Sequence, residues 1–525
     1  MVKKSRNIIG LAVLMLVVMV CVVFQAHERG YIKTGSDTVY NDKEDKNRKK
    51  EKTGKEKKKN NVASVKNDKN NSSHAKKQNT IKNNRYGENP ELKVLITTTG
   101  YTSLFHDKVC IKSSKPFEVV YGKKVKKFKG GSKVVFKSSE RKKKNKKVVV
   151  RSCSNAKLRI MSVKRQEGRP AYRGRFEIKW TRNGLLLKNI VPLEQYLYSV
   201  VPSEMPSGSD MSALKAQAVC ARSFAYSKLD SAKYKKYGAH VDDSVACQVY
   251  NNIFEDKRTI KAVNDTKDIV MMTKDKKVAL GYYFATSWGC TADGKEVWDT
   301  EQAVSYLKGK LQVSNKSKGS RRLNLSDENL FRNFISKNVY STYDSSDQWY
   351  RWKTNIKKSS LSSRIDSLLY SCYTSDKNSV LTQNKSGKYR KVLLKSIGKI
   401  RKIRVEKREK SGLVTELVIV GKKRVVKVCG QYNVRKVLAP IYENIKRKDG
   451  SKVSGMKLLP SAAFYIDMIK KGNKEIFVIK GGGFGHGSGM SQTGACNMAE
   501  AGYDYKSILT HYYDGIIVDN ISKSN

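Results

Sequence analysis

Residues 28–88 limit what this chain of 525 residues can fold into, because they contain very few apolar side chains. The segment is dominated by Lys, Asn, Glu and Ser, as in KEDKNRKKEKTGKEKKKNN. Such a composition cannot bury enough apolar surface to offset the entropy of ordering the chain. We therefore expect residues 28–90 to form a disordered, extended tether, and the folded part to begin near residue 91.

An apolar run precedes this tether. Residues 8–24 carry no charge and follow Lys3, Lys4 and Arg6. The run is about long enough to span a bilayer, and the cationic flank should stay in the cytoplasm. A cleaved signal peptide is the alternative, but no small-x-small cleavage site directly follows the run. We expect residues 1–27 to be a single-pass cell-membrane anchor, with the rest of the chain extracytoplasmic.

The formal net charge of +59 calls for an acidic partner. Nucleic acid, anionic lipid and an anionic cell-wall polymer all qualify on charge alone. An extracytoplasmic location argues against nucleic acid and against ATP-driven chemistry, which leaves a wall polymer or a membrane surface. The nine cysteines include no CxxC pair. We expect mostly buried free thiols, although disulfides cannot be paired or excluded from the sequence.

Short β-like runs fill residues 91–185, namely ELKVLITTT, FEVVYG, SKVVFKS, KVVVRS and FEIKW. Two helices should follow: one opened by Pro192 and ended by Pro202, the other over 211–229 with Ser209 or Asp210 as N-cap. Strand-like runs resume in RKIRVEKRE and TELVIVG. The predicted fold class is α+β, a strand-rich catalytic domain with a few helices around a cleft. The predicted divisions after the tether are 91–185 (strand-rich), 186–300 (core), 301–400 (variable, insertion-like) and 401–525 (C-terminal part of the core).

A glycine-rich stretch, GGGFGHGSGMSQTGA, occupies residues 481–495. A strand-like run over 475–479 precedes it and a helix-like run over 492–500 follows. This layout is typical of nucleotide-binding loops, but the stretch lacks the Gly-Lys-Ser/Thr of a P-loop and the βαβ context of a dinucleotide site. Glycines permit close backbone approach, and we expect them to leave the ring of His486 accessible.

Several residues are candidates for chemistry. Glu204 lies in the expected loop PSEMPSGS, where apolar neighbours could raise its pKa, as a general acid requires. Near His486, the side chains of Cys496, Ser488 and Ser491 are candidate nucleophiles, but no third orienting group is recognisable. His240 and Cys247 are too few for a structural metal site, which needs four ligands.

Four separated stretches resemble the stage II sporulation protein D family of lytic transglycosylases from spore-forming Gram-positive bacteria. They are VPLEQYLYSVVPSEMPSGSDMSALKAQAVCARSFAYSKL (191–229), YYFATSWGCTADGKEVW (282–298), RVEKREKSGLVTELVIVG (404–421) and GGGFGHGSGMSQTGACNMAEAGYDYKSILTHYYDGI (481–516). The resemblance covers roughly residues 91–520 in family order. It implies that the glycine-rich stretch helps wall the cleft around the catalytic glutamate and touches the sugar chain.

Carried over by position, the resemblance implies that Glu204 is the catalytic residue. It also implies substrate-binding roles for a set of polar residues in the other motifs: Lys215, Gln217, Arg222, Ser287, His486, Ser491 and Gln492. The chain departs from the family pattern at Ser207–Asp210, Trp288 and Thr493, which could reshape the cleft. Some relatives hold zinc with a cysteine pair before Gln-x-Tyr. Here Cys247 precedes QVY but Val241 replaces its partner, so we expect that no cofactor is required.

The implied reaction cleaves the bond between N-acetylmuramic acid and N-acetylglucosamine in peptide-free glycan strands and leaves 1,6-anhydro ends, during sporulation. A cell-wall amidase is the implied partner. Two alternatives stay open. One is a non-catalytic amidase enhancer or wall-binding module, and the other is a hydrolase that uses water and a second carboxylate.

Overall fold

The computed structural model describes residues 89–140, 146–298, 304–313, 323–337, 340–392 and 396–524. The predicted anchor and tether lie outside these ranges. Within them, no helix combines the length and the apolar character that crossing a membrane requires. The described part is a mixed α+β structure, rich in strands with a smaller number of helices, as the sequence predicted.

Two largely antiparallel sheets face each other in the N-terminal region. The larger has the order β12-β1-β11-β10-β7-β4-β5, with β2 beside β11, and the smaller has the order β6-β3-β8-β9. Their apolar faces meet, and the rings of Phe136 and Trp180 contact edge to face across them with centroids 5.9 Å apart. The strands of the larger sheet are β1 (Glu91–Leu95), β2 (Phe105–His106), β4 (Phe117–Tyr121), β5 (Lys124–Phe128), β7 (Lys147–Ser152), β10 (Arg175–Thr181), β11 (Gly184–Pro192) and β12 (Val241–Asp242). Those of the smaller are β3 (Lys108–Lys112), β6 (Lys133–Lys137), β8 (Leu158–Ile160) and β9 (Ala171–Tyr172).

A helical layer packs into the same core. Its members are α2 (Leu193–Glu204), α3 (Met211–Ser227), α4 (Lys257–Asp265), α9 (Gln492–Glu500) and α10 (Tyr505–Tyr512), beside the pair β13 (Ile269–Met272) and β26 (Ile517–Asn520). Asp210 caps α3 as predicted, because its side chain accepts from the backbone N–H of Ser212.

The prediction that Pro202 ends the first helix is wrong. Pro202 lies inside the last turn of α2, which continues to Glu204. A proline there removes only one backbone hydrogen bond close to the helix end, so the turn tolerates it. Glu204 is therefore the last residue of a buried helix and not part of a loop.

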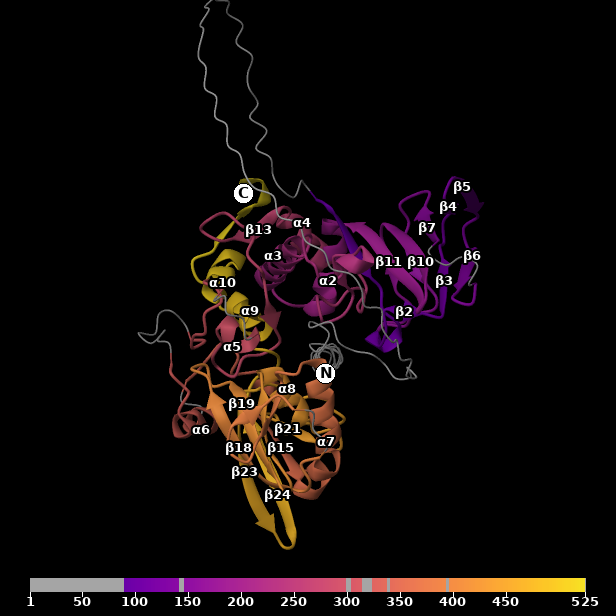
Figure 1. Cartoon of the computed structure of the whole chain (residues 1–525). Coiled ribbons are helices and arrows are strands. Elements are labelled where there is room, and N and C mark those ends of the chain that lie inside the picture. The colour runs from indigo at the N-terminus through magenta and orange to yellow at the C-terminus, as the bar shows by residue number, and fades with distance from the viewer. Residues whose placement is uncertain are drawn as a thin grey trace, which may run out of the picture. The chain divides into compact units, whose positions relative to one another are not determined.

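A second hydrophobic core holds two five-stranded sheets. One has the order β22-β21-β15-β24-β23, formed by β15 (Trp352–Lys357), β21 (Ile445–Arg447), β22 (Lys452–Val453), β23 (Phe464–Lys471) and β24 (Lys474–Gly481). The other has the order β17-β16-β20-β19-β18, formed by β16 (Val380–Gln383), β17 (Tyr389–Arg390), β18 (Ile400–Arg408), β19 (Val414–Gly421) and β20 (Val425–Cys429). The accompanying helices are α6 (Glu328–Lys337), α7 (Lys358–Ser375) and α8 (Gln431–Val437). Figure 1 shows α7 alongside β15 and β24.

The domain boundary predicted at residue 400 divides this second core. β15 pairs with β24, so that Ile356 lies opposite Phe477, and β16 pairs with β20. Residues 301–400 are therefore one part of a larger unit that extends to about residue 481. Local sequence patterns could not reveal this, because the pairing of β15 with β24 joins strands more than one hundred residues apart.

The chain returns to the first core after residue 481. The short strand β25 (Met490–Ser491) pairs in parallel with β14 (Tyr283–Phe284), and β26 pairs with β13. The remaining short elements are α5 (Gly294–Trp298), η2 (Thr99–Tyr101), η4 (Lys235–Tyr237), η5 (Gln348–Tyr350) and η6 (Ile521–Lys523). The last forty residues thus complete a core that begins near residue 91.

Candidate active site

The carboxyl group of Glu204 lies at the C-terminal end of α2, where only 8% of the residue is exposed. Its Oε1 accepts a hydrogen bond of 2.6 Å from the backbone N–H of Val249. The hydroxyl of Tyr283 on β14 donates to the same carboxyl group, and Gln248 Nε2 in turn donates to the Tyr283 oxygen over 3.3 Å. Three segments distant in sequence therefore converge on one carboxyl.

Burial raises the pKa of Glu204 to about 7, although the hydrogen bonds from Val249 and Tyr283 oppose the rise. No other carboxylate of the described residues contributes to this pKa shift. A carboxyl with a pKa near neutrality is partly protonated at pH 7, so it can both give and take a proton. The sequence argument from apolar neighbours pointed to this direction of shift.

Two glutamines predicted to bind substrate lie beside Glu204. Gln492, the first residue of α9, donates from Nε2 to the Glu204 carbonyl oxygen over 2.9 Å and to Gln217 Oε1 over 3.3 Å. Gln217 is fully buried, and its Nε2 has no hydrogen-bond partner among the described residues. A buried donor without a partner is costly, and a polar ligand group could satisfy it.

The glycines of residues 481–489 serve close packing against residues 282–288. A Cβ on Gly489 would lie 1.9 Å from the carbonyl oxygen of Tyr282, and one on Gly487 would lie 2.5 Å from the ring of Trp288. Both glycines also have positive φ, +81° and +89°, which other residues rarely adopt. The glycine-rich stretch thus lets its backbone lie close to residues 282–288, where β25 pairs with β14.

His486 is half-buried in an aromatic group, so the expectation of an accessible ring is met only in part. Its ring lies with centroid distances of 5.2 Å to Trp298, 5.6 Å to Phe284 and 6.1 Å to Tyr282. Burial, together with the charge of Arg435, lowers the pKa of His486 to about 3. The imidazole is therefore neutral at pH 7. Tyr282 also stacks on Trp298, with centroids 3.9 Å apart.

Arg222 does not lie where a substrate could reach it. Its guanidinium is fully buried and forms a bidentate pair with Glu194, with distances of 2.6 and 2.7 Å. It also donates to the carbonyl oxygens of Val263 and Ile269. The structure corrects the substrate-binding prediction: Arg222 joins α2, α3 and the start of β13.

Three further predicted substrate ligands have internal partners. Lys215 pairs with Asp265 on α4 over 2.9 Å. Ser287 and Ser491 are fully buried, and both donate to Asp344 Oδ1. Ser287 donates from its backbone N–H over 2.9 Å, and Ser491 donates from its hydroxyl. Neither serine presents its hydroxyl to a ligand, so this part of the prediction is also corrected.

The candidate nucleophiles near His486 lack the features of a nucleophile. Burial raises the pKa of Cys496 to about 11, so the thiol stays protonated. Ser488 is fully buried, and its hydroxyl has no partner within the described ranges. The eight cysteines in the described part form no disulfide.

The residues considered for zinc do not fit a zinc site. His240 Nδ1 accepts from the backbone N–H of Lys93 over 3.2 Å, and burial raises the pKa of Cys247 to about 12. In the part of the chain that the structure describes, no three side chains of His, Cys, Asp or Glu gather as metal ligands do.

Sequence reasoning missed three residues that form hydrogen bonds to Glu204 or to the segments beside it. Tyr283 lies within one of the four family-like stretches but was given no role, and Asp344 and Asp347 lie in residues 301–400, which were predicted to be variable and insertion-like. Burial raises the pKa of Asp344 to about 6 against its hydrogen bonds from Ser491 and Ser287. The only available signal for Tyr283 was its place in the motif, and no local pattern marks the two aspartates.

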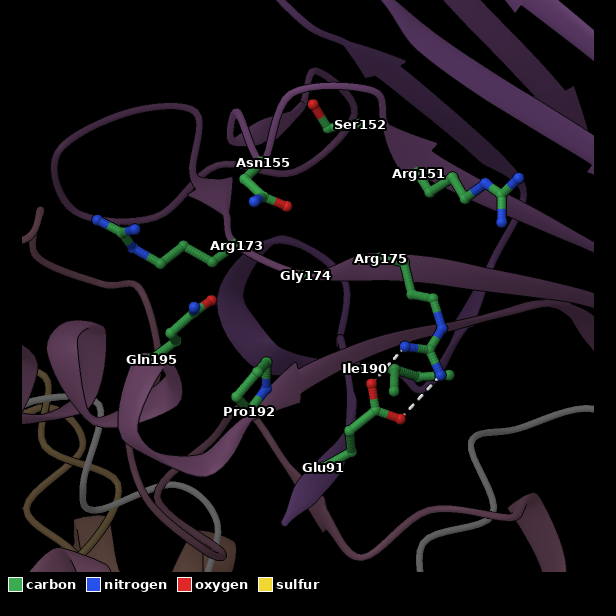
Figure 2. Close-up of a pocket in the computed structure, with 10 residues that line it drawn as sticks. All are labelled: Glu91, Arg151, Ser152, Asn155, Arg173, Gly174, Arg175, Ile190, Pro192 and Gln195. Carbon is green, nitrogen blue, oxygen red and sulfur yellow. Dashed lines mark hydrogen bonds and ion pairs between the residues drawn. The ribbon is translucent and has the colours of Figure 1, made fainter. Parts of the chain in front are cut away.

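A cavity of about 490 Å³ lies near the other end of α2 (Figure 2). Gln195 and Pro192 line it, so it lies roughly 14 Å along the helix from Glu204. Its three arginines each face a glutamate: Arg151 pairs with Glu118, Arg173 with Glu255 and Arg175 with Glu91. None of the predicted site residues lines this cavity.

Two models of known families match separate regions of the chain, and these regions correspond to parts of the two cores described above. Residues 181–273 match the model described as Stage II sporulation protein, which covers α2, α3 and Glu204. Residues 292–489 match a model described as a domain of unknown function (DUF8618), which covers the second core. Glu204 thus lies in the first matched region, while the second ends just before β25.

Characterised relatives agree with the first match. The chain is 30% identical over 319 residues to the amidase enhancer of Bacillus subtilis (strain 168), which is 61% of this chain and 39% of that protein. It is 35% identical over 131 residues to the stage II sporulation protein D of the same strain, which is 22% of this chain and 38% of that protein. It is 26% identical over 340 residues to stage II sporulation protein D of Bacillus amyloliquefaciens, which is 62% of this chain and 74% of that protein.

The matches define a region of the sporulation type within this chain. Residues 181–273 are similar to the stage II sporulation protein D family, as the motifs there indicated, and the chain spans 38–39% of the length of two of these relatives.

Proposed function

We propose that this chain is a peptidoglycan lytic transglycosylase with Glu204 as its single acid–base residue. The observation that supports it most directly is the buried Glu204 carboxyl with its pKa near 7. An ordinary glycoside hydrolase needs two carboxylates, whereas an intramolecular ring closure needs only one. The proposal assigns both proton transfers to Glu204, so it requires no second carboxylate.

In the proposed reaction, protonated Glu204 gives its proton to the glycosidic oxygen as the bond from C1 of N-acetylmuramic acid breaks. The resulting carboxylate then takes the proton of the 6-hydroxyl while that oxygen bonds to C1. The products are a 1,6-anhydro end and a free 4-hydroxyl, and Glu204 is protonated again. Proton transfer of this kind contributes about 10² to 10⁴-fold, so substrate positioning must supply much of the remainder.

Side chains near Glu204 would position the sugar in this proposal. Gln217 is fully buried, and it would act by accepting from Gln492 Nε2 and so holding that side chain beside Glu204. The stacked rings of Tyr282 and Trp298 are only partly buried and could carry the apolar face of a sugar ring. The neutral ring of His486 lies beside them.

We also propose the setting. The apolar run at residues 8–24 would anchor the chain in the cell membrane with its folded part outside. Peptidoglycan glycan strands would be the substrate and a cell-wall amidase the partner, during sporulation. The net charge of +59 would favour attraction to an anionic wall.

A second candidate function is favoured by one relative, which is named amidase enhancer. In that case the chain would stimulate an amidase or bind the wall without cleaving glycan, and Glu204 would be dispensable.

The deciding experiment is mass spectrometry of peptide-free glycan strands incubated with the full chain or with Glu204→Gln. The proposal predicts anhydro ends from the wild type alone, with glycan binding retained by the variant. Reducing ends would indicate a hydrolase. Stimulation of an amidase by both proteins, without glycan cleavage by either, would support the second function.

Glu296→Gln is the matched control. Burial also raises the pKa of Glu296 to about 7, but this carboxyl lies in α5 and is hydrogen-bonded to Ser411. The variant should cleave glycan like the wild type. If Glu296→Gln abolished cleavage and Glu204→Gln did not, the acid would have been assigned to the wrong residue.

A further inference from the structure

Asp344 and Asp347 lie in the second matched region, residues 292–489, and accept hydrogen bonds from the segments that carry the candidate site. Asp344 is fully buried, and no lysine or arginine of the described residues forms an ion pair with it. A buried carboxyl without a cation costs free energy unless hydrogen bonds compensate it. The donors that compensate Asp344 therefore indicate which parts of the fold it holds.

Those donors lie in the two segments that contain the short paired strands β14 and β25. Asp344 Oδ1 accepts from the backbone N–H of Ser287, just beyond β14, and from the hydroxyl of Ser491 at the end of β25. Asp347 repeats the arrangement at neighbouring positions, accepting from Thr286 Oγ1 over 3.2 Å and from Thr493 Oγ1 over 3.4 Å. Each carboxyl thus joins the same two segments.

Ser491 has a second role, because it is also the N-cap of α9 and accepts from the backbone N–H of Gly494 over 3.3 Å. The hydrogen bond to Asp344 fixes the rotamer in which the Ser491 oxygen can cap the helix. The next residue, Gln492, donates to the main chain of Glu204. A short path of hydrogen bonds therefore leads from Asp344 to the carboxyl-bearing end of α2.

We propose that Asp344 is a positioning residue, which acts through Ser491 and Gln492 to fix Glu204, and that the second matched region thereby completes the acid–base site. Asp347 supports the same two segments. This inference rests on the proposed function and gives the region of unknown function a role in it.

The test is a double-mutant cycle on kcat/KM with Asp344→Leu, Gln492→Ala and the double variant. Asp344→Leu should lower kcat/KM about tenfold, since small misplacements in a site can cost up to about 10²-fold. In the Gln492→Ala background it should cause less than about a twofold further loss, because the path is already broken. Losses that multiply would overturn the proposal.

Two milder variants keep the test usable if Asp344→Leu does not fold. Asp344→Asn retains an oxygen that can accept from both serines, so it should stay within about threefold of the wild type. Ser491→Ala removes the donor and the cap together and should reproduce the loss seen for Asp344→Leu. An asparagine variant as impaired as the leucine variant would contradict the positioning role.

Asp366 in α7 provides the matched control. It likewise accepts from a serine hydroxyl, that of Ser396 over 2.6 Å, and from a backbone N–H, that of Ile397 over 3.0 Å. It lies in the second core, and these hydrogen bonds join α7 to residues 396–397 and not to α9. The effects of Asp366→Leu and Gln492→Ala on kcat/KM should therefore multiply.

The same double-mutant cycle can be measured without catalysis. The quantity is then the pKa of the ¹³C-labelled Glu204 carboxyl, measured by NMR, and Glu204→Gln assigns the signal. If the wild type produces no anhydro ends, the proposed function fails, but this readout still tests the positioning path. Shifts in the Glu204 pKa that do not add between Asp344→Leu and Gln492→Ala support it. An unchanged Glu204 pKa in Asp344→Leu overturns it.

Discussion

At the scale of single residues, the raised pKa of Glu204 links stability to pH. The folded protein holds this proton more tightly than the unfolded chain does, because the pKa is about 7 in the fold against an ordinary value of 4.5 for a glutamate. The stabilising effect is complete below about pH 4.5 and is lost as the pH rises to about 7. Above that, an ionised carboxylate is held in a buried site.

Glu204→Gln should therefore stabilise the protein at high pH. Each pKa unit corresponds to about 1.4 kcal/mol, so the free energy of unfolding should rise by up to about 3 kcal/mol at pH 8. At pH 4 the variant and the wild type should unfold alike. Urea unfolding at both pH values measures the difference, and a gain of the same size at pH 4 would contradict the assigned pKa.

Tyr283→Phe should move the pH dependence of cleavage. The Tyr283 hydroxyl lowers the pKa of Glu204, so its removal should raise that pKa and shift the alkaline limb of the rate profile upward by about 0.5 to 1 unit. Tyr198→Phe is the control, because Tyr198 lies on the same helix as Glu204 but its hydroxyl donates to Asn264 instead. A downward shift in Tyr283→Phe would show that water enters the site.

Sequence reasoning at this scale succeeded where a residue's neighbours decide its chemistry. The apolar residues around Glu204 are adjacent in the chain, so the direction of its pKa shift could be predicted. Arg222 was misassigned because its partner, Glu194, lies 28 residues earlier and is recognisable only when α2 packs on α3. Asp344 was missed because its two donors are far away in the chain: Ser287 lies 57 residues earlier and Ser491 lies 147 residues later.

At the scale of elements, the buried pair of Arg222 and Glu194 holds the two helices that frame Glu204. Arg222→Ala would leave the Glu194 carboxylate buried and unpaired, which typically costs about 3–5 kcal/mol. We expect a large fall in Tm with little change in KM for the protein that remains folded. Arg151→Ala is the control, because its side chain is 55% exposed and pairs with Glu118, so it should cost less than about 1 kcal/mol.

The pairing of β14 with β25 depends on Gly489. A Cβ there would overlap the carbonyl oxygen of Tyr282, and φ would be unfavourable for alanine. Gly489→Ala should separate the two strands and lower cleavage at least tenfold, measured as anhydro ends released. Gly472→Ala is a control with a similarly positive φ, +57°, and with no atom within 4 Å of the added Cβ. It should retain activity.

Most individual elements could be predicted, because periodicity and caps are local signals. The helix over 492–500 and the strand over 475–479 occur as expected, and Asp210 caps α3. The end of α2 could not be placed, because a proline in a last turn is tolerated when the helix is packed. Strand partners were beyond reach, since pairing is a long-range property.

At the scale of the whole molecule, the net charge of +59 should govern association with the cell wall. Attraction between exposed charges is screened within about 10 Å at 0.1 M salt and within about 3 Å at 1 M. We expect co-sedimentation of the full chain with purified wall sacculi at low salt and its release as salt approaches 1 M. Retention at 1 M would point to recognition of the glycan itself, independent of charge.

The return of the chain to its first core has a consequence for biosynthesis. A ribosome that has made residues up to Gly481 has produced α2 with its carboxyl and both sheets of the second core, but not Gln492 or the partner strand of β14. Such a nascent or truncated chain keeps the hydrogen bonds of Val249 and Tyr283 to Glu204 but lacks the contact from Gln492. The site is therefore complete only after residues 482–492 have been translated, and a proteolytic cut after residue 481 would separate Gln492 from the polypeptide that carries Glu204.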